Sequence, residues 1–407
     1  MADIAFRGIE KVSVELFDLE QATFTRTYQL QERYAERGDI WHVVGTDLIK
    51  DGKSGNSFIH KTWERGEYIW HNYKFVSITR RGIESDSRDL PPNSILIDLN
   101  IEGASTLIRE KIFRRESITG LVTAEVEQYI ERYGLYRGRI PNRATNYSMT
   151  DPRLLLVLDD QNEKAKVWAS RLEKYAVDDR QNCIVVIGGD GTMLRAIRKY
   201  WRLRLPFFGI NAGHLGFLLN NHQEIFEFGF PPEDLLLRQL PLLYVETIDP
   251  EGSSSQTLAF NDVWVERATS QAAWIEVKVN NQVRLPKLIG DGVLVATAAG
   301  STAYARAMGA MPMLAETPAF LLVGSNILSP PNWKTVLLSF DSEVELQSLG
   351  GDKRSIKCYA DGFLQGKVVN MKARISRIAS AEVAFCASHD MAEKIAQLQF
   401  PKSPLTF

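Results

Sequence analysis

The segment that most restricts the possible folds of this chain is a buried strand that runs directly into a glycine-rich loop. Residues 183–187 form a continuous apolar run, Gly188-Gly189-Asp190-Gly191-Thr192 follows at once, and a helical pattern covers 193–197. A short strand that is apolar at every position is typical of a parallel sheet covered on both faces. Strand, tight loop and helix in this order predict one unit of an open α/β layer.

The flanking segments extend this α/β pattern. Residues 153–158 form another apolar run, and a helical pattern follows in which Ala165, Trp168, Leu172 and Tyr175 share one face. A third short strand is expected at 207–210, and a final helix at 389–398 is expected to fold back onto this layer. Parallel strands joined by helices form right-handed crossovers. We therefore expect an α/β phosphate-binding domain over 152–238 plus about 385–407.

From about residue 240 the spacing changes to that of a β protein. Strand-like runs dominate, and we expect strands at 258–265, 273–279, 292–297, 335–340, 344–349 and 368–378. Two packed sheets are the usual arrangement of such strands. The sequence therefore predicts a β-sandwich domain over 239–384.

The first 145 residues are expected to form a separate α+β domain. A polar, turn-rich stretch at 137–143 marks its end. Strands are expected at 12–17, 40–44, 73–78 and 94–99, and a helix at 121–133. This domain carries no motif to which we can assign a role.

Charged and apolar residues alternate over 58–65 in this N-terminal region. The pattern favours a strand of a sheet with one wet face, and a barrel with a charged lumen for a polyphosphate or nucleotide is the alternative. His42, His60 and His71 share no metal-ligand spacing, so structural or solvated roles are expected.

Composition excludes several classes of protein. The chain has 407 residues, 44% hydrophobic and 24% charged, which is typical of a globular protein with two or three domains. A net charge of −2 gives no electrostatic footprint for nucleic acid or an anionic membrane. Three widely spaced cysteines argue against a disulfide framework or a zinc site. We expect a cytoplasmic protein without nucleic-acid or membrane partners.

The glycine-rich loop has the composition of a phosphate site. Glycines permit positive φ and let backbone N–H groups approach phosphate oxygens, and a helix N-terminus adds partial positive charge. Thr192 is the expected N-cap. Asp190 would repel phosphate unless it holds a cation or takes a proton, and both roles belong to phosphoryl transfer. The alternative is a tight Gly-Asp-Gly turn without a chemical role.

Four later loops supply the short polar groups that a nucleotide needs on rigid element ends. They are Gly209-Ile210-Asn211-Ala212-Gly213-His214-Leu215-Gly216-Phe217-Leu218, Asn261-Asp262, Gly290-Asp291-Gly292 and Gly300-Ser301-Thr302-Ala303-Tyr304. Together with the phosphate loop and the downstream Asp361-Gly362, these segments resemble the NAD kinase family over about residues 152–400. The phosphate loop alone is shared with diacylglycerol-type lipid kinases and, loosely, with phosphofructokinases. The two longest loops are far more specific.

The resemblance implies an α/β domain followed by a β-sandwich domain, with the site between them and a homo-oligomeric assembly. It implies transfer of a terminal phosphoryl group from ATP or polyphosphate to the 2′-hydroxyl of NAD, with Mg²⁺ or Mn²⁺. The metal would be held mainly by substrate phosphates, with Asp190 as a further candidate ligand. Asp190 would also take the proton of the hydroxyl.

The other site residues follow from the same resemblance. The donor phosphates and nucleotide would be bound by Gly188, Gly189, Gly191, Thr192 and Arg195. The acceptor would be bound by Phe217, Asn261, Asp262, Asp291, Thr302, Ala303 and Tyr304.

The chain departs from the family pattern on the acceptor side. Ala298 and Ala299 replace a Pro-Thr pair, Ala307 replaces a serine, and Asn326 lies where the family has a histidine segment. The phosphate loop is intact. Two alternatives therefore stay open: a kinase of this fold that acts on another nucleoside, a polyol or a lipid, and a non-catalytic dinucleotide sensor.

Overall fold

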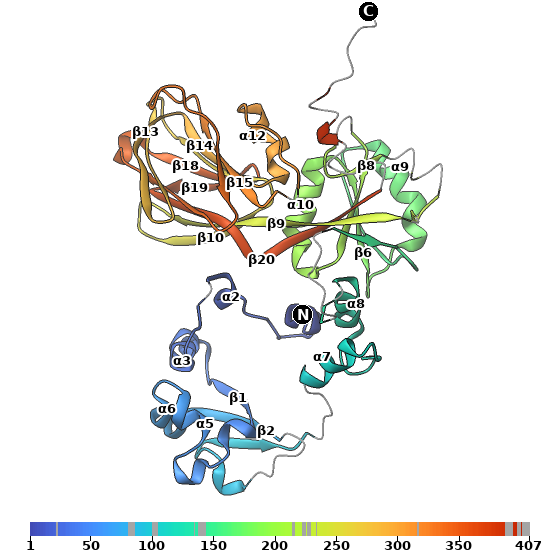
Figure 1. The fold of residues 1–407 in the computed structure, drawn as a ribbon, viewed down its shortest axis with the longest axis vertical. Helices are drawn as coiled ribbons and strands as arrows, with labels where there is room; N and C mark the ends of the chain where they lie inside the picture. The colour runs from blue at the N-terminus through green and yellow to red at the C-terminus, as the bar shows by residue number, and fades with distance from the viewer. Residues whose placement is uncertain are drawn as a thin grey trace, which may run out of the picture. The chain divides into compact units, whose positions relative to one another are not determined.

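The computed structural model describes residues 1–21, 23–79, 86–99, 105–133, 135–136, 144–213, 216–221, 225, 229–232, 234–315, 317–386, 394–396 and 400. The chain forms two compact units, one of Ser13–Arg139 and one that combines Met1–Val12 with Ile140–Phe407 (Figure 1). In the described part of the chain, no helix has the length and apolar character that a membrane crossing requires.

The unit of Ser13–Arg139 contains a three-stranded parallel sheet in the order β1 (Trp41–Gly45), β2 (Lys74–Ile78), β3 (Ser94–Ile97). Its helices are α2 (Phe17–Gln21), α3 (Thr27–Tyr34), α4 (Thr46–Ile49), α5 (Phe58–Thr62), α6 (Gly66–Asn72), α7 (Ser105–Phe113) and α8 (Ala124–Tyr133). Ile59, Ile69 and Phe75 form the centre of its core. The expected strands at 40–44, 73–78 and 94–99 and the helix at 121–133 are confirmed within a few residues.

Two expectations for this unit were wrong. Residues 58–65 hold helix α5 instead of a strand, because Ser57 Oγ accepts the backbone N–H of His60 at 3.3 Å and caps a helical turn whose Ile59 is fully buried. Residues 12–17 form no strand. A barrel is excluded for the described strands, since β1 and β3 are both edges of an open sheet.

The histidines of this unit have ordinary partners. His60 Nδ1 lies 2.7 Å from Ser57 Oγ, and His42 Nε2 lies 2.8 Å from the side chain of Gln31. His71 pairs with Glu67 at 3.1 Å. These contacts are those of structural or surface histidines, as expected.

The larger unit begins its α/β layer with three parallel strands, β5 (Leu154–Leu158), β6 (Cys183–Gly188) and β7 (Pro206–Asn211). Helices α9 (Glu163–Leu172) and α10 (Asp190–Tyr200) connect them. Every residue of β6 is buried, as its continuous apolar run predicts. The three strands and both helices are confirmed.

These strands belong to an eleven-stranded sheet in the order β13-β12-β17-β20-β7-β6-β5, to which further strands pair from the side. The remaining members are β4 (Ala144–Tyr147), β8 (Asn220–Asn221), β9 (Leu235–Ile248), β10 (Ser254–Ala259), β12 (Ala273–Val279), β13 (Gln282–Gly290), β17 (Glu343–Ser348) and β20 (Asn370–Cys386). Long strands β9 and β20 cross from the α/β layer into the β part (Figure 1). The α/β layer and one sheet of the β part are therefore continuous.

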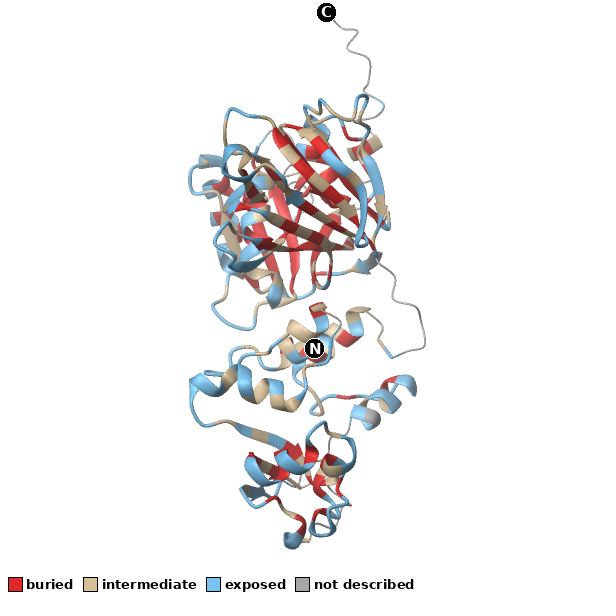
Figure 2. Ribbon diagram, turned by 90° about the vertical axis from the view of Figure 1, so that its left-hand side faces the viewer, coloured by how far each residue is buried: buried red, intermediate tan, exposed pale blue. Residues whose placement is uncertain are grey.

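A second sheet of six strands packs in the β part. Its order is β16-β15-β14-β11-β18-β19, all antiparallel. The bounds are β11 (Asp262–Arg267), β14 (Gly292–Ala296), β15 (Ala319–Ser325), β16 (Val336–Ser339), β18 (Ile356–Ala360) and β19 (Phe363–Val368). One core, with Val263, Val295 and Val344 among its members, contains side chains of both sheets. Buried residues accordingly follow the strands of this unit (Figure 2).

The N-terminal strap, which we define as Met1–Val12, belongs to this larger unit and not to the one that follows it in sequence. Its helix α1 (Ala2–Ala5) contributes the buried Ile4. Asp3 Oδ1 accepts a hydrogen bond of 2.8 Å from Arg202, just after α10. The strap thus packs near the helix that carries the phosphate loop.

Candidate active site

The phosphate loop lies at the carboxyl edge of the parallel strands, where open α/β sheets bind their ligands. Strand β6 ends at Gly188 and α10 starts at Asp190, so the loop between them is very short. The backbone of Ala212, just after β7, donates to the Gly188 carbonyl at 2.8 Å. The loops after β6 and β7 are therefore adjacent.

The carboxylate of Asp190 is held by the loop that follows β7. Backbone N–H groups of Phe217 and Leu218 each donate to one of its oxygens at 3.0 Å. Phe217 itself is 9% exposed, and its described role is this backbone contact. His214 and Leu215 of the same loop lie outside the described residues. The structure thus joins two loops that the sequence placed 27 residues apart.

The glycines of the phosphate loop matter because they lack a Cβ, which lets other atoms approach the backbone closely. An ideal Cβ on Gly189 would meet nothing within 4 Å, and one on Gly191 would meet only the tip of Arg195 at 3.9 Å. A Cβ on Gly188 would lie 2.6 Å from Thr192 Oγ1. None of these glycines adopts a positive φ, so only the close approach that glycine permits is relevant here. Gly189 and Gly191 leave an open face at a helix N-terminus, which suits an anion.

Thr192 does not cap helix α10, contrary to expectation. The N-cap is Gly189, and Thr192 lies in the first turn, where it is 3% exposed. Its hydroxyl accepts a hydrogen bond of 3.1 Å from Arg195 Nη2. Thr192 thus positions the Arg195 guanidinium beside the loop.

Burial raises the pKa of Asp190, although the two N–H donors and the Lys394 ammonium pull it down. Lys394 donates to the carbonyls of Gly216, at 3.0 Å, and Leu219, on either side of the N–H groups that hold Asp190. A carboxylate with a raised pKa is a better proton acceptor than an exposed one. Sequence reasoning missed Lys394, which carries no motif and lies far along the chain.

The Asn261-Asp262 pair lies at the start of β11, and its backbone is fixed. The carbonyl of Asn261 accepts the N–H of Thr297 at 2.9 Å, and Thr297 Oγ1 donates to the carbonyl of Phe260 at 2.8 Å. A Cβ on Gly300 would lie 2.0 Å from the Asn261 carbonyl oxygen. Asn261 is 7% exposed, and its Oδ1 has no partner among the described residues. A buried amide oxygen without a partner is suited to a ligand donor.

The hydroxyls that follow Gly300 bind the chain's own backbone. Ser301 Oγ donates to the Ala298 carbonyl at 2.6 Å, and Thr302 Oγ1 to that of Ala299 at 3.1 Å. Tyr304 begins helix α12 (Tyr304–Ala307) and is 42% exposed. Thr302 therefore shapes the turn, while Tyr304 presents a side chain to solvent.

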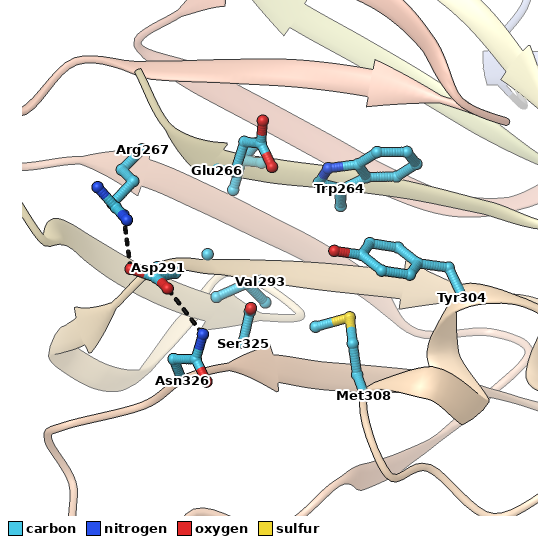
Figure 3. Close-up of a pocket in the computed structure, with 11 residues that line it drawn as sticks. Trp264, Glu266, Arg267, Asp291, Val293, Tyr304, Met308, Ser325 and Asn326 are labelled. Carbon is cyan, nitrogen blue, oxygen red and sulfur yellow. Dashed lines mark hydrogen bonds and ion pairs between the residues drawn. The ribbon is translucent and has the colours of Figure 1, made fainter. Parts of the chain in front are cut away.

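Asp291 lies in a separate pocket of about 410 Å³ (Figure 3). Arg267 Nε donates to one of its oxygens at 2.6 Å and Asn326 Nδ2 to the other at 2.7 Å. Asp262 pairs with Ala296 of β14. Ala296 is five residues along the chain from Asp291, so Asp262 and Asp291 lie about 16 Å apart at about 3.3 Å per residue. The structure therefore does not bring Asp291 and Asp262 together.

Aromatic rings line the same pocket. The Tyr304 and Trp264 rings lie 5.1 Å apart, and Trp264 stacks on Tyr359 at 4.9 Å and 10°. Figure 3 shows Tyr304 and Trp264 facing each other. Sequence reasoning missed Trp264 and Glu266, although their alternation along β11 could have placed both on one face. The volume of this pocket, about 410 Å³, lies within the usual range of small-molecule sites.

The phosphate-loop helix shares one core with residues beside Asn261 and Gly300. Met193 of α10, Phe260 and Ala299 belong to the same buried cluster. Arg198, on the next turns of α10, lies 4.8 Å from the centre of the Phe363 ring, which follows Asp361-Gly362. The structure thus packs the helix of the phosphate loop against the Asn261 region.

Carboxylates in this region do not form a metal cage. No group of three or more His, Cys, Asp or Glu side chains in the described ranges could hold a metal ion. A magnesium ion bound mainly through substrate phosphates needs no such group.

Asp262 has an unusual protonation equilibrium. It is 3% exposed, and burial, reinforced by the charge of Asp361, raises its pKa to about 7. In the unfolded chain its pKa is near 3.8. Between about pH 4 and pH 7 the folded protein therefore keeps a proton that the unfolded protein has released. Because the folded state binds more protons there, the free energy of unfolding falls as pH rises through this window and levels off above it.

Replacing Asp262 by asparagine is expected to remove part of this fall, at most about 1.4 kcal/mol per pH unit. Urea denaturation of both proteins at pH 5 and pH 7 measures it. Burial raises the pKa values of Asp190 and Asp361 as well, so a smaller slope of the same sign should persist. An equal loss of stability in variant and wild type would show that Asp262 ionises normally.

Comparison with known proteins identifies the family of this chain. The family model described as ATP-NAD kinase N-terminal domain matches residues 147–227. The NAD kinase of Xanthomonas oryzae pv. oryzae (strain MAFF 311018) is 31% identical over 264 residues, which cover 62% of this chain and 99% of that protein. The chain belongs to the NAD kinase family.

A further relative supports the same assignment, and a solved structure shares the fold. The NAD kinase of Rickettsia rickettsii (strain Sheila Smith) is 30% identical over 232 residues, covering 56% of this chain and 90% of that protein. The crystal structure of yeast NADH kinase complexed with NADH has a TM-score of 0.54 at 16% identity, covering 65% of this chain and 94% of that one. The predicted membership and the kinase-like α/β layer with additional sheet are thereby confirmed.

Proposed function

We propose that this protein is a kinase that transfers the terminal phosphoryl group of ATP to the 2′-hydroxyl of NAD and so forms NADP. The observation that carries the proposal is the buried carboxylate of Asp190, which two backbone N–H groups hold at the open end of a glycine loop and a helix. Family membership supports the reaction, and the match to the ATP-NAD kinase domain supports ATP as the donor. Polyphosphate is the alternative donor.

The proposed reaction is an in-line displacement. Backbone N–H groups at Gly189 and Gly191 bind donor phosphates, and Arg195 adds a positive charge beside them. Asp190 takes the proton of the attacking hydroxyl, the new O–P bond forms, and ADP leaves. Asp190 is a candidate ligand for Mg²⁺, which would be held mainly by phosphate oxygens and would supply positive charge to the phosphates.

The acceptor is expected to span two places. Asn261 and Asp262 would bind one nucleoside, and the pocket with Asp291 and Tyr304 would bind the other. Their separation suits a molecule with two nucleosides joined by a diphosphate. Phe217, Thr302 and Ala303 would contribute mainly through backbone and shape.

One observation favours a different acceptor as the second candidate. Asn326, which departs from the family pattern, donates to Asp291, and Arg267 occupies the other oxygen. An Asp291 with both oxygens engaged has less capacity to accept hydrogen bonds from a ligand. Another nucleoside or a polyol could therefore be the acceptor.

The test is incubation of the purified protein with Mg²⁺-ATP and, in parallel, NAD, NADH and a panel of nucleosides, polyols and lipids. Formation of NADP supports the proposal. A product from another acceptor only selects the second candidate, and tight NAD binding without turnover selects a sensor. We further propose a homo-oligomeric assembly and a cytoplasmic location. We also propose that the larger unit divides into an α/β domain over 152–238 plus about 385–407 and a β-sandwich domain over 239–384.

A further inference from the structure

We call Phe260-Asn261-Asp262 the acceptor loop. The carboxylate of Asp361 binds the three successive backbone N–H groups of this loop. Phe260 donates to Oδ2 at 2.7 Å, and Asn261 and Asp262 donate to Oδ1 at 2.7 and 3.3 Å. Asp361 lies in the turn between β18 and β19, about 100 residues further along the chain. The amides of all three residues of the loop thus depend on a single side chain.

The turn that carries Asp361 is a two-residue hairpin turn between β18 and β19, with an Asp-Gly pair at its centre. Asp361 adopts a φ of 49° and Gly362 a φ of 84°, both in the left-handed region. The N–H of Asp361 also donates to the carbonyl of Asp262 at 2.9 Å. The local sequence itself favours this turn, and the turn presents the Asp361 carboxylate to the acceptor loop.

The acceptor loop is held from its other side as well. Thr297 donates to the carbonyls of Phe260 and Asn261, so Asp361 and Thr297 together restrain both the donors and the acceptors of its backbone. What is left is the Asn261 side chain, with an Oδ1 that has no partner among the described residues. A rigid backbone aims this amide at one point in space.

The segment that carries this turn also contacts helix α10, which begins at the phosphate loop. Arg198 of α10 lies over the Phe363 ring at 4.8 Å, and its charge partly offsets the raised pKa that burial gives Asp361. The β18–β19 turn therefore touches the donor helix with one residue and the acceptor loop with another.

We propose that Asp361 is a positioning residue that aims Asn261 at the acceptor and so sets acceptor affinity without touching the donor. This inference rests on the proposed function, and it assigns to the Asp361-Gly362 turn a role in acceptor binding. A carboxylate suits the role because its two oxygens can accept all three N–H groups. An asparagine has one acceptor oxygen and would turn an NH₂ group toward a backbone N–H.

The test is Asp361→Asn, which keeps the shape of the side chain. We expect KM for NAD to rise at least about tenfold, with KM for ATP within about twofold of wild type. Asn261→Ala serves in a double-mutant cycle. If Asp361 acts through Asn261, Asp361→Asn should raise KM for NAD far less in the Asn261→Ala background.

The matched control is Asp249→Asn. Asp249 also accepts a backbone N–H, that of Ser253 at 2.8 Å, but in the turn between β9 and β10. It should leave both KM values unchanged. Equal changes in the KM for NAD and for ATP in Asp361→Asn would overturn the proposal, as would an unchanged KM for NAD.

A second readout separates this inference from the proposed reaction. Hydrogen exchange of the amides at 260–262 should be at least about tenfold faster in Asp361→Asn, whichever acceptor the enzyme uses. If wild type forms no NADP, the proposed function fails, while unchanged exchange at these amides defeats the positioning role. Should Asp361→Asn not fold, Arg198→Met loosens the same turn from its exposed side. It is then expected to accelerate exchange at these amides about threefold, and no change there would overturn the inference.

Discussion

Replacing Asp190 by asparagine is expected to lower kcat at least about a thousandfold while the protein stays folded. General-base catalysis contributes about 10²–10⁴-fold, and asparagine cannot take a proton from the attacking hydroxyl. The amide has nearly the same shape, but it can accept only one of the two N–H groups from Phe217 and Leu218. Initial rates of NADP formation, with circular dichroism for the fold, measure the effect.

Asp179→Asn is the matched control for this experiment. Asp179 is exposed in the loop that precedes β6, at the opposite end of that strand from the phosphate loop. It should retain full activity. A kcat for Asp190→Asn within tenfold of wild type would remove Asp190 from the chemistry and leave the glycine loop as a binding element only.

Substituting alanine for Gly300 is expected to cost about 1–3 kcal/mol of stability and to weaken NAD binding strongly. The new Cβ would lie 2.0 Å from the carbonyl oxygen and 2.5 Å from the carbonyl carbon of Asn261, both backbone atoms. The backbone must therefore shift, and Asn261 must shift with it. Urea denaturation gives the loss of stability, and titration with NAD gives the loss of affinity.

Gly189→Ala provides the contrast. Its Cβ would meet no atom of the described structure within 4 Å, so the free energy of unfolding should change little. The methyl group would instead project into the space proposed for donor phosphates and raise KM for ATP. If the two glycine variants lost equal stability, close approach at Gly300 could not be the reason for its glycine.

The α/β layer could be predicted from sequence because buried parallel strands have a strong local pattern. Residues 183–187 are apolar throughout, and the loop after them can only be a tight turn into a helix. Residues 58–65 show the opposite case. Their alternation fits a strand, but the Ser57 cap and the burial of Ile59 select a helix. A period of two is ambiguous over so short a run.

Parts of the candidate site could be predicted only as separate motifs. The sequence pattern identified Asp190, Asn261 and Asp361, but the hydrogen bonds that join them to their loops connect residues up to about 100 positions apart. Contacts at that separation leave no local signal. Lys394 shows the same limit, since its partners are backbone carbonyls, which any sequence provides.

The N-terminal strap has a consequence for how the protein assembles during synthesis. Asp3 and its partner Arg202 are 199 residues apart, and the whole of Ser13–Arg139 lies between them. At about 5–20 residues per second, the ribosome needs roughly 10–40 s to make the 199 residues that separate Asp3 from Arg202. Until Arg202 has been made, the strap lacks this partner, and the unit of Ser13–Arg139 can fold before the strap is paired. A shortened protein that joins residue 12 directly to residue 140 should therefore keep the strap and fold sooner.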